Sequence, residues 1–170
     1  LAVPAPDGGN VLLALAEARA SVRDWGRIDL VLKRSVDNGR SWSGIHVVAD
    51  ARMVGLPEGS TVGNPCSVYD AVRQRVVLLL TTNMGEDNEA RIWAGHSRGT
   101  REVFVCFSSD LGASWTSPRN ITTMAKPEAQ WTWYATGPGS GVQLKHPSAA
   151  DGALAAPANG RLVVPCNHVK

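Results

Sequence analysis

An eight-residue pattern that occurs twice constrains the fold of this chain more than any other feature. Residues 35–42 and residues 108–115 both read S-x-D-x-G-x-S-W, and the two copies start 73 residues apart (108 − 35). Five shared positions within eight residues indicate repeated copies of one structural unit. A repeat of this length is typical of β-propellers and related arrays, in which each unit is a small antiparallel sheet.

Each copy of the pattern has the residues of a turn that follows a strand. An apolar, β-prone run precedes it, at residues 28–33 in the first case and 103–107 in the second. Asp accepts hydrogen bonds from the backbone of its own turn, and Gly adopts a positive φ. The closing Trp packs its ring against the hairpin. The pattern matches the Asp box, which closes the outer hairpin of propeller blades in several protein classes, so we expect Asp37 and Asp110 to be structural.

Composition excludes several classes of function. The net charge is +2 and the basic residues are scattered, which disfavours nucleic-acid binding. The chain has no run of about 18 apolar residues, so it encodes no transmembrane helix. Its three cysteines, Cys66, Cys106 and Cys166, lack metal-binding or redox spacing, and we expect buried thiols. The compartment in which the protein works stays open.

Four further segments resemble the sialidase family and occur in the family's order. Residues 13–19 read LALAEAR and are followed by Asp24, which is similar to the family's L-L-A-F-A-E-x-R segment before its acid Asp. Residues 63–70 (GNPCSVYD), 137–144 (GPGSGVQL) and 161–165 (RLVVP) resemble three later family segments. With both Asp boxes, the resemblance covers nearly the whole chain.

The resemblance implies an all-β fold, a partial six-bladed β-propeller. Residues 1–170 would form a single incomplete propeller domain of about two and a half blades of antiparallel hairpins, which is the N-terminal half of the propeller. The implied activity is that of an exo-α-sialidase, which releases terminal sialic acid from glycoconjugates with retention. Sialylated glycans are the implied partners, and no cofactor is implied.

The family's site holds three arginines on the sugar carboxylate, an acid/base Asp, and a Tyr nucleophile activated by a Glu. Of these groups, the resemblance maps only the acid/base onto this sequence, at Asp24, and it adds Arg19 at the position of an accessory arginine. It places substrate contacts at Asn64, Glu89, Asn167 and His168. The other groups find no counterpart here, so we expect the chain to be a fragment that is inactive by itself.

Plainer interpretations of the same residues stay open. By composition, Asp24 is a solvated loop residue, Asn64 shapes the turn before Pro65, and Glu89 belongs to an acidic loop. We expect residues 83–99 to form a long polar loop with a short strand near Ile92. At the level of function, the alternatives are a trans-sialidase and a non-catalytic Asp-box propeller that binds glycans or proteins.

Overall fold

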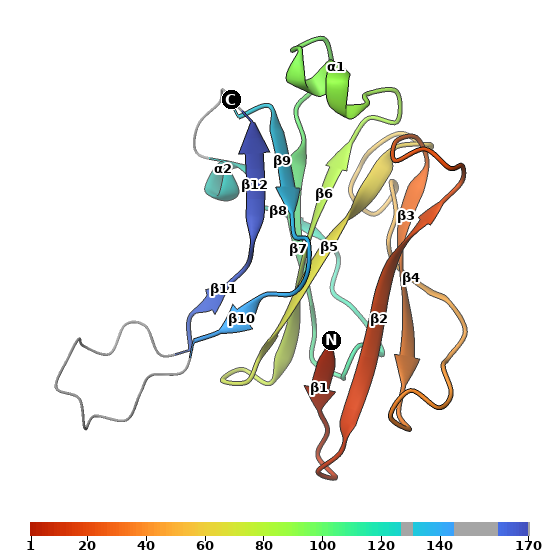
Figure 1. Cartoon of the computed structure of the whole chain (residues 1–170), viewed down its shortest axis with the longest axis vertical. Coiled ribbons are helices and arrows are strands. Elements are labelled where there is room, and N and C mark those ends of the chain that lie inside the picture. Colours follow the sequence, from red (N-terminus) through yellow and green to blue (C-terminus); the bar gives the residue numbers. More distant parts are fainter. Residues whose placement is uncertain (127–130, 145–159, 170) are drawn as a thin grey trace, which may run out of the picture.

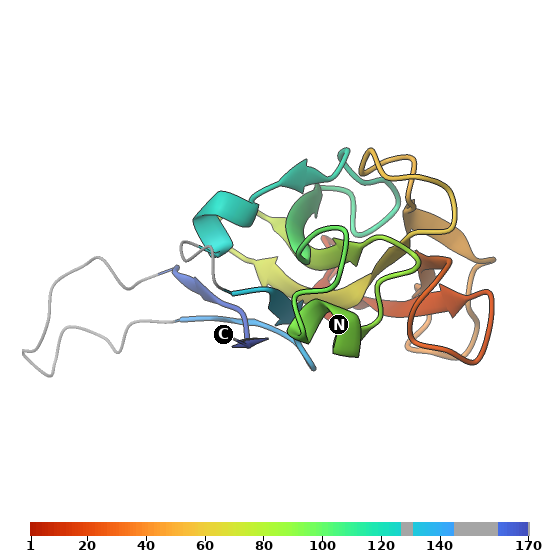
Figure 2. The same cartoon turned by 90° about the horizontal axis from the view of Figure 1, so that it is seen from above.

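Three groups of antiparallel strands lie side by side in the molecule (Figures 1 and 2). The structure is a computed structural model of the chain, and it describes residues 1–126, 131–144 and 160–169. The first group contains β1 (Ala2–Pro4), β2 (Asn10–Arg19), β3 (Ile28–Ser35) and β4 (His46–Ala49), paired in that order. Although β2 is rich in alanine, Val11 and Leu13 alternate with less buried residues, and this period of two is that of a half-buried strand.

The second group forms the centre of the molecule. It contains β5 (Thr61–Asp70), β6 (Arg75–Asn83), β7 (Glu102–Ser108) and β8 (Arg119–Asn120), again paired in chain order. A single parallel pairing, Ile28 with Thr61, joins it to the first group. The first two groups are therefore two four-stranded antiparallel units whose strands pair with each other at one end only.

The third group packs beside the second and is smaller. It consists of β9 (Trp133–Thr136) paired with β12 (Cys166–Val169), and of β10 (Val142–Gln143) paired with β11 (Leu162–Val163). The hydroxyl of Thr136 donates to the carbonyl of Asn64, and the amide of Gly141 donates to the carbonyl of Ser67. These bonds fix the third group against β5.

The main core lies inside the first two groups of strands. It includes buried apolar side chains from β1, β2, β3, β6 and β7, among them Val3, Leu30, Leu32, Leu78 and Phe104. The strands do not close into a ring within the described residues, and the all-β partial propeller expected from the sequence is confirmed. No helix in the described part of the chain is long and apolar enough to cross a membrane.

Two local expectations were wrong. The segment near Ile92 is not a strand but the helix α1 (Glu89–Trp93), in which the side chain of Asn88 caps the amide of Arg91 and Ile92 is buried. A second short helix, α2, covers Thr122–Ala125. Cys166 is exposed rather than buried, unlike Cys66 and Cys106.

The two Asp boxes form equivalent turns at one end of the strands. Asp37 accepts hydrogen bonds from the amide and hydroxyl of Ser41, at 2.9 and 2.6 Å. Asp110 accepts the same pair from Ser114, at 2.9 and 2.5 Å. Because β3 and β7 both run toward these turns, α1 and the loop that follows β2 lie at the opposite end (Figure 1). The length of β3 puts the two ends about 25 Å apart.

Candidate functional site

A pocket of about 290 Å³ opens where the three groups of strands meet. It lies toward the α1 end, since residue 17 is near the end of β2 and residue 64 is near the start of β5. Three polar side chains in its lining come from three different groups, Glu17 from β2, Asn64 from β5 and Asn167 from β12. Its other lining residues are Pro65, Ala135, Thr136, Gly137, Pro138 and Gly139.

Glu17 ties the two main groups together at this pocket. Its Oε1 accepts a hydrogen bond from the backbone amide of Asn64 at 2.8 Å. Its Oε2 accepts from Nε and Nη2 of Arg19 at 2.9 and 2.6 Å. Sequence reasoning missed Glu17 as a site residue. The available signal was its spacing, because residues two apart on a strand share one face.

Asn64 sits at an irregularity of β5. The pairing of β5 with β6 shifts register between Gly63 and Cys66, and Asn64 has a φ of 53°. A bulge of this kind re-aims a side chain, and asparagine tolerates the left-handed region better than most residues. The side-chain Oδ1 of Asn64 accepts a hydrogen bond from the hydroxyl of Thr81 at 2.8 Å, and this bond holds the Asn64 amide at the pocket.

Asp24 lies in the loop between β2 and β3 and is exposed. The amide of Ala20 donates to the carbonyl of Arg27 and closes the base of this loop. Asp24 makes no hydrogen bond or ion pair with another residue of the described ranges. Its catalytic role therefore stays a prediction, and its carboxylate is not committed to a contact within the fold.

Glu89 is the first residue of α1 and is also exposed. It extends from a well-anchored segment, because the neighbouring Asp87 is buried and accepts from the amide of Arg98 at 2.9 Å. Glu89 does not line the pocket. It stands at the same end of the molecule as the loop of Asp24, and its charge acts on the same cation, described below.

Asn167 and His168 are neighbours on β12 with different surroundings. Asn167 lines the pocket, whereas His168 stacks on Trp131 with ring centroids 3.7 Å apart and planes 9° apart. Successive residues of a strand point to opposite faces, so the two side chains do not share one. Of the pair, the geometry favours Asn167 as a pocket residue.

Arg101 is a buried cation that the sequence did not reveal. Its side chain stacks on the ring of Trp133 at 4.1 Å, and its Nε donates to Oδ1 of Asn83 at 3.1 Å. Burial lowers the pKa of Arg101 to about 10, and the charges of Glu17, Glu89 and Asp24 act against this shift. The guanidinium is therefore still charged at neutral pH, and the charges of three acidic side chains act on it.

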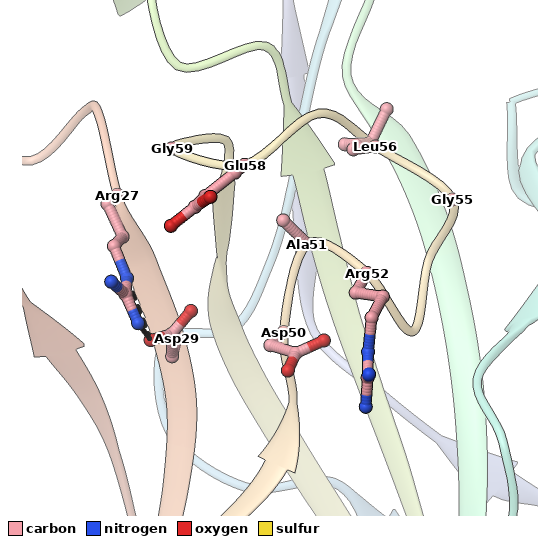
Figure 3. A pocket seen from close by; sticks show the side chains of 9 residues that line it. All are labelled: Arg27, Asp29, Asp50, Ala51, Arg52, Gly55, Leu56, Glu58 and Gly59. Atoms are coloured by element: carbon pink, nitrogen blue, oxygen red, sulfur yellow. Dashed lines mark hydrogen bonds and ion pairs between the residues drawn. The ribbon is translucent and has the colours of Figure 1, made fainter.

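A larger cavity, of about 540 Å³, lies elsewhere in the molecule and contains none of the six residues that the sequence pointed to. Figure 3 shows its lining, which comes largely from the segment between β4 and β5. Arg27 and Asp29 form an ion pair in its wall, with Nη2 and Oδ2 3.3 Å apart. Glu58 in this lining is likewise exposed, with no hydrogen bond or ion pair in the described ranges, but none of the segments that resemble the sialidase family lies there.

The smaller pocket and its rim can bind a polar, hydroxyl-rich ligand. Glu17 is neutralised by Arg19, while Asp24 has no partner among the described residues. An acid/base catalyst needs a carboxylate that is free to exchange a proton with the ligand, and Asp24 meets this requirement better than Glu17 does. Across the described ranges, no group of three or more His, Cys, Asp or Glu side chains is placed to hold a metal ion.

Comparisons with known proteins agree with this arrangement. A family model described as a BNR repeat-like domain matches residues 5–169. Sialidase-4 of Homo sapiens is 36% identical over 167 residues, a match that covers 96% of this chain and 31% of the relative. The solved structure of the Hadza microbial sialidase Hz136 has a TM-score of 0.72 and 27% identity, and the match covers 85% of this chain and 29% of that one.

The intramolecular trans-sialidase of Ruminococcus gnavus has the same fold, with a TM-score of 0.65 at 14% identity, over 98% of this chain and 54% of that one. At this identity the likeness concerns the fold alone. The chain spans about a third of the length of the curated relatives that it matches.

Proposed function

Because the chain belongs to the BNR repeat-like family and its relatives are sialidases, we propose that the protein is an exo-α-sialidase. Such an enzyme is a glycoside hydrolase that releases terminal sialic acid from glycoconjugates, here with retention of configuration. The residues described above supply one side of the site. We also propose that residues 1–170 do not turn over a sialoside by themselves, since the chain spans about a third of its curated relatives.

The arrangement around Asp24 carries this proposal. An exposed carboxylate without a partner in the described ranges stands five residues after Arg19, at the end of the molecule where the pocket opens. In the proposed reaction Asp24 gives a proton to the departing glycosidic oxygen and later takes one from water. Asn64 and Asn167 offer amide groups to the hydroxyls of the sugar.

Transfer of the sugar to another acceptor is the second candidate function. The fold of the Ruminococcus gnavus trans-sialidase favours it only at the level of architecture. Product analysis separates the two reactions, because a hydrolase yields free sialic acid whereas a transferase yields a new glycoside or an anhydro sugar.

The role of Asp24 is tested in the full-length protein with two substrates of different leaving group. We expect Asp24→Ala to lower kcat for a natural sialyl-galactoside by about 10²- to 10⁴-fold, the usual contribution of general acid catalysis. An aryl α-sialoside should lose much less, because a phenolate departs with little help from a proton.

The matched control is Asp7→Ala, which removes an exposed aspartate from the turn between β1 and β2, at the other end of the molecule. It should leave both rates unchanged. Equal losses on the two substrates with Asp24→Ala would mean that this residue binds or folds rather than donates a proton. No cleavage of either substrate by the wild-type protein would refute the sialidase proposal itself.

A further inference from the structure

Arg101 is held unusually firmly for an arginine at the end of a strand. Its backbone amide donates to the carbonyl of Thr132, and its own carbonyl accepts from Nζ of Lys126 at 2.8 Å. The side chain is clamped as well, by Asn83 at Nε and by the ring of Trp133 on one face. Only 4% of the residue is exposed.

The two terminal nitrogens of the Arg101 side chain nevertheless make no hydrogen bond that stabilises the fold within the described ranges. Nη1 and Nη2 of Arg101 have no hydrogen-bond acceptor within the described ranges, and no carboxylate there lies within ion-pair distance. Both nitrogens still reach solvent, since neither is one of the fully buried side-chain atoms without a hydrogen-bond partner. The fold thus fixes the position of the guanidinium while its terminal donors stay available to a ligand.

The surroundings of these donors indicate what they bind. Arg19 neutralises Glu17, and the carboxylate of Glu102 acts on the ammonium of Lys126. The charges that remain to act on Arg101 are those of Glu89 and Asp24, so among the described residues the local balance is negative by about one unit. An anionic group of a ligand is disfavoured there. A hydroxyl is favoured, because it accepts from a guanidinium and donates to a nearby carboxylate at the same time.

Arg101 does not itself line the pocket, but the ring on which it stacks belongs to β9, a strand that does. Trp133, on which it stacks, and Ala135, which lines the pocket, are two residues apart on β9 and share a face. Trp93 of α1 meets Trp133 edge-on, with ring centroids 6.3 Å apart. The ring of Trp133 thus links Arg101 to the helix that carries Glu89.

We propose that Arg101 is a specificity-determining residue that reads one neutral hydroxyl of the bound sugar through its Nη donors, with a carboxylate of the rim accepting the hydroxyl proton. This inference rests on the proposed sialidase function for the identity of the sugar. It concerns a residue outside the set that the sequence resemblance points to, and it assigns to that residue a contact with the ligand rather than a part in folding alone.

The test is a set of thermodynamic cycles, each of which combines the substitution Arg101→Met in the protein with removal of one hydroxyl from the sugar. The full-length protein and its Arg101→Met variant are compared by calorimetric binding of sialic acid and of analogues that each lack one hydroxyl, and by kcat/KM on the matching aryl α-sialosides. We expect Arg101→Met to weaken binding of the complete sugar by about 10- to 150-fold, as for a hydrogen bond to a charged group. The variant should no longer distinguish the complete sugar from one particular deoxy analogue.

Arg75→Met is the matched control, because Arg75 also stacks on an aromatic ring, that of Phe107 at 4.2 Å, but at the other end of β6. A structural role for Arg101 predicts that both variants lose thermal stability and retain the discrimination of the wild type. The proposal would be overturned if removal of each hydroxyl weakened binding by the same factor in the wild type as in Arg101→Met. Binding without turnover would refute the sialidase activity while the binding cycles still decide the role of Arg101, and absence of binding by the wild type would refute both.

Discussion

Glu17 shows how much of the site depends on a single side chain. One of its oxygens holds the backbone of Asn64 on β5, and the other holds Arg19 on its own strand. Gly63 makes this possible, because a Cβ at that position would overlap Oε1 of Glu17. A side chain at position 63 would therefore push the carboxylate of Glu17 aside, so the glycine matters for space rather than for backbone conformation.

Gly63→Ala should consequently displace the carboxylate of Glu17 and release both partners. We expect kcat/KM of the full-length protein toward an aryl α-sialoside to fall by about 10²-fold, the usual effect of misplacing a positioning group by about 1 Å. Gly44→Ala is the control, since a Cβ there has no neighbour within 4 Å. Unchanged activity of Gly63→Ala would show that Glu17 relaxes without consequence for the site.

At this scale the sequence predicts some site residues and misses others. Asp24 and Asn64 were predicted from the order of recognisable segments along the chain; Asn64 lines the pocket, and the role of Asp24 stays a prediction. Arg101 was not predicted, because its environment is made by Asn83 and Trp133, which are 18 and 32 residues away in sequence. Nothing local marks an arginine at the start of β7 as buried.

At the scale of the secondary-structure elements, each Asp box stabilises its turn through a carboxylate that accepts hydrogen bonds from the same turn. Hydrogen bonds from the hydroxyl and amide of Ser41 hold the pKa of Asp37 down to about 2. For Asp110, partial burial raises the pKa, but the bonds from Ser114 and Ser108 outweigh it and the value is again about 2. Both carboxylates are thus ionised in the folded protein at a pH where free aspartate is protonated.

The sign of the resulting pH dependence follows from these depressed values. The contribution of both boxes to stability is complete above the unfolded pKa of about 4, and it is lost as pH falls toward 2. The double variant Asp37→Asn/Asp110→Asn should be less stable at pH 7 and should show a flatter decline between pH 4 and 2 than the wild type. Urea unfolding at a series of pH values measures this.

Asp7→Asn serves as the control in that series, because its carboxylate accepts from one backbone amide, that of Gly9. It should leave the slope of stability against pH as in the wild type. A double variant whose decline between pH 4 and 2 equals that of the wild type would contradict the assignment of this acid sensitivity to the boxes.

Elements were predicted well where a pattern extends over a whole strand and poorly where capping decides. β2 forms a strand although its alanine-rich sequence favours a helix, since a preference of a few tenths of a kcal/mol per residue is outweighed by pairing within the sheet. α1 was missed, because a five-residue helix presents no periodicity and depends on the cap at Asn88. Short capped helices fall below the length at which sequence period is informative.

For the molecule as a whole, the site exists only while three strand groups keep their places. The sequence predicted their antiparallel character from the repeated box, but not the contacts that dock one group on another. Those contacts join residues far apart in the chain, such as Gln143 with Asp70 and Thr136 with Asn64. Each such pair consists of ordinary polar residues, so no local pattern distinguishes them.

Gln143 is the best point at which to test this docking. Its Oε1 accepts from the amide of Ala71 at 2.8 Å, and its Nε2 donates to Oδ1 of Asp70 at 2.8 Å and to the carbonyl of Gly160 at 3.0 Å. One side chain thus bridges the turn between β5 and β6 and the third group. Asp70 is fully buried, so loss of its amide partner leaves its carboxylate less well satisfied.

Gln143→Leu should therefore loosen the third group more than it unfolds the protein. We expect a loss of about 1–3 kcal/mol in unfolding free energy, as for a buried acceptor that loses a partner. Amide exchange should quicken in β9 and β12 and stay slow in β6 and β7, because local opening does not need to reach the main core. The pocket should lose ligand affinity in the same variant, since Thr136 and Asn167 reach it from the loosened group.

Gln74→Leu is the control, because Gln74 lies on the same turn but is exposed, and it should change neither amide exchange nor ligand affinity. Faster exchange spread evenly over all strands would mean that the three groups unfold as one cooperative unit, and that the site is kept together by the core rather than by these bridges.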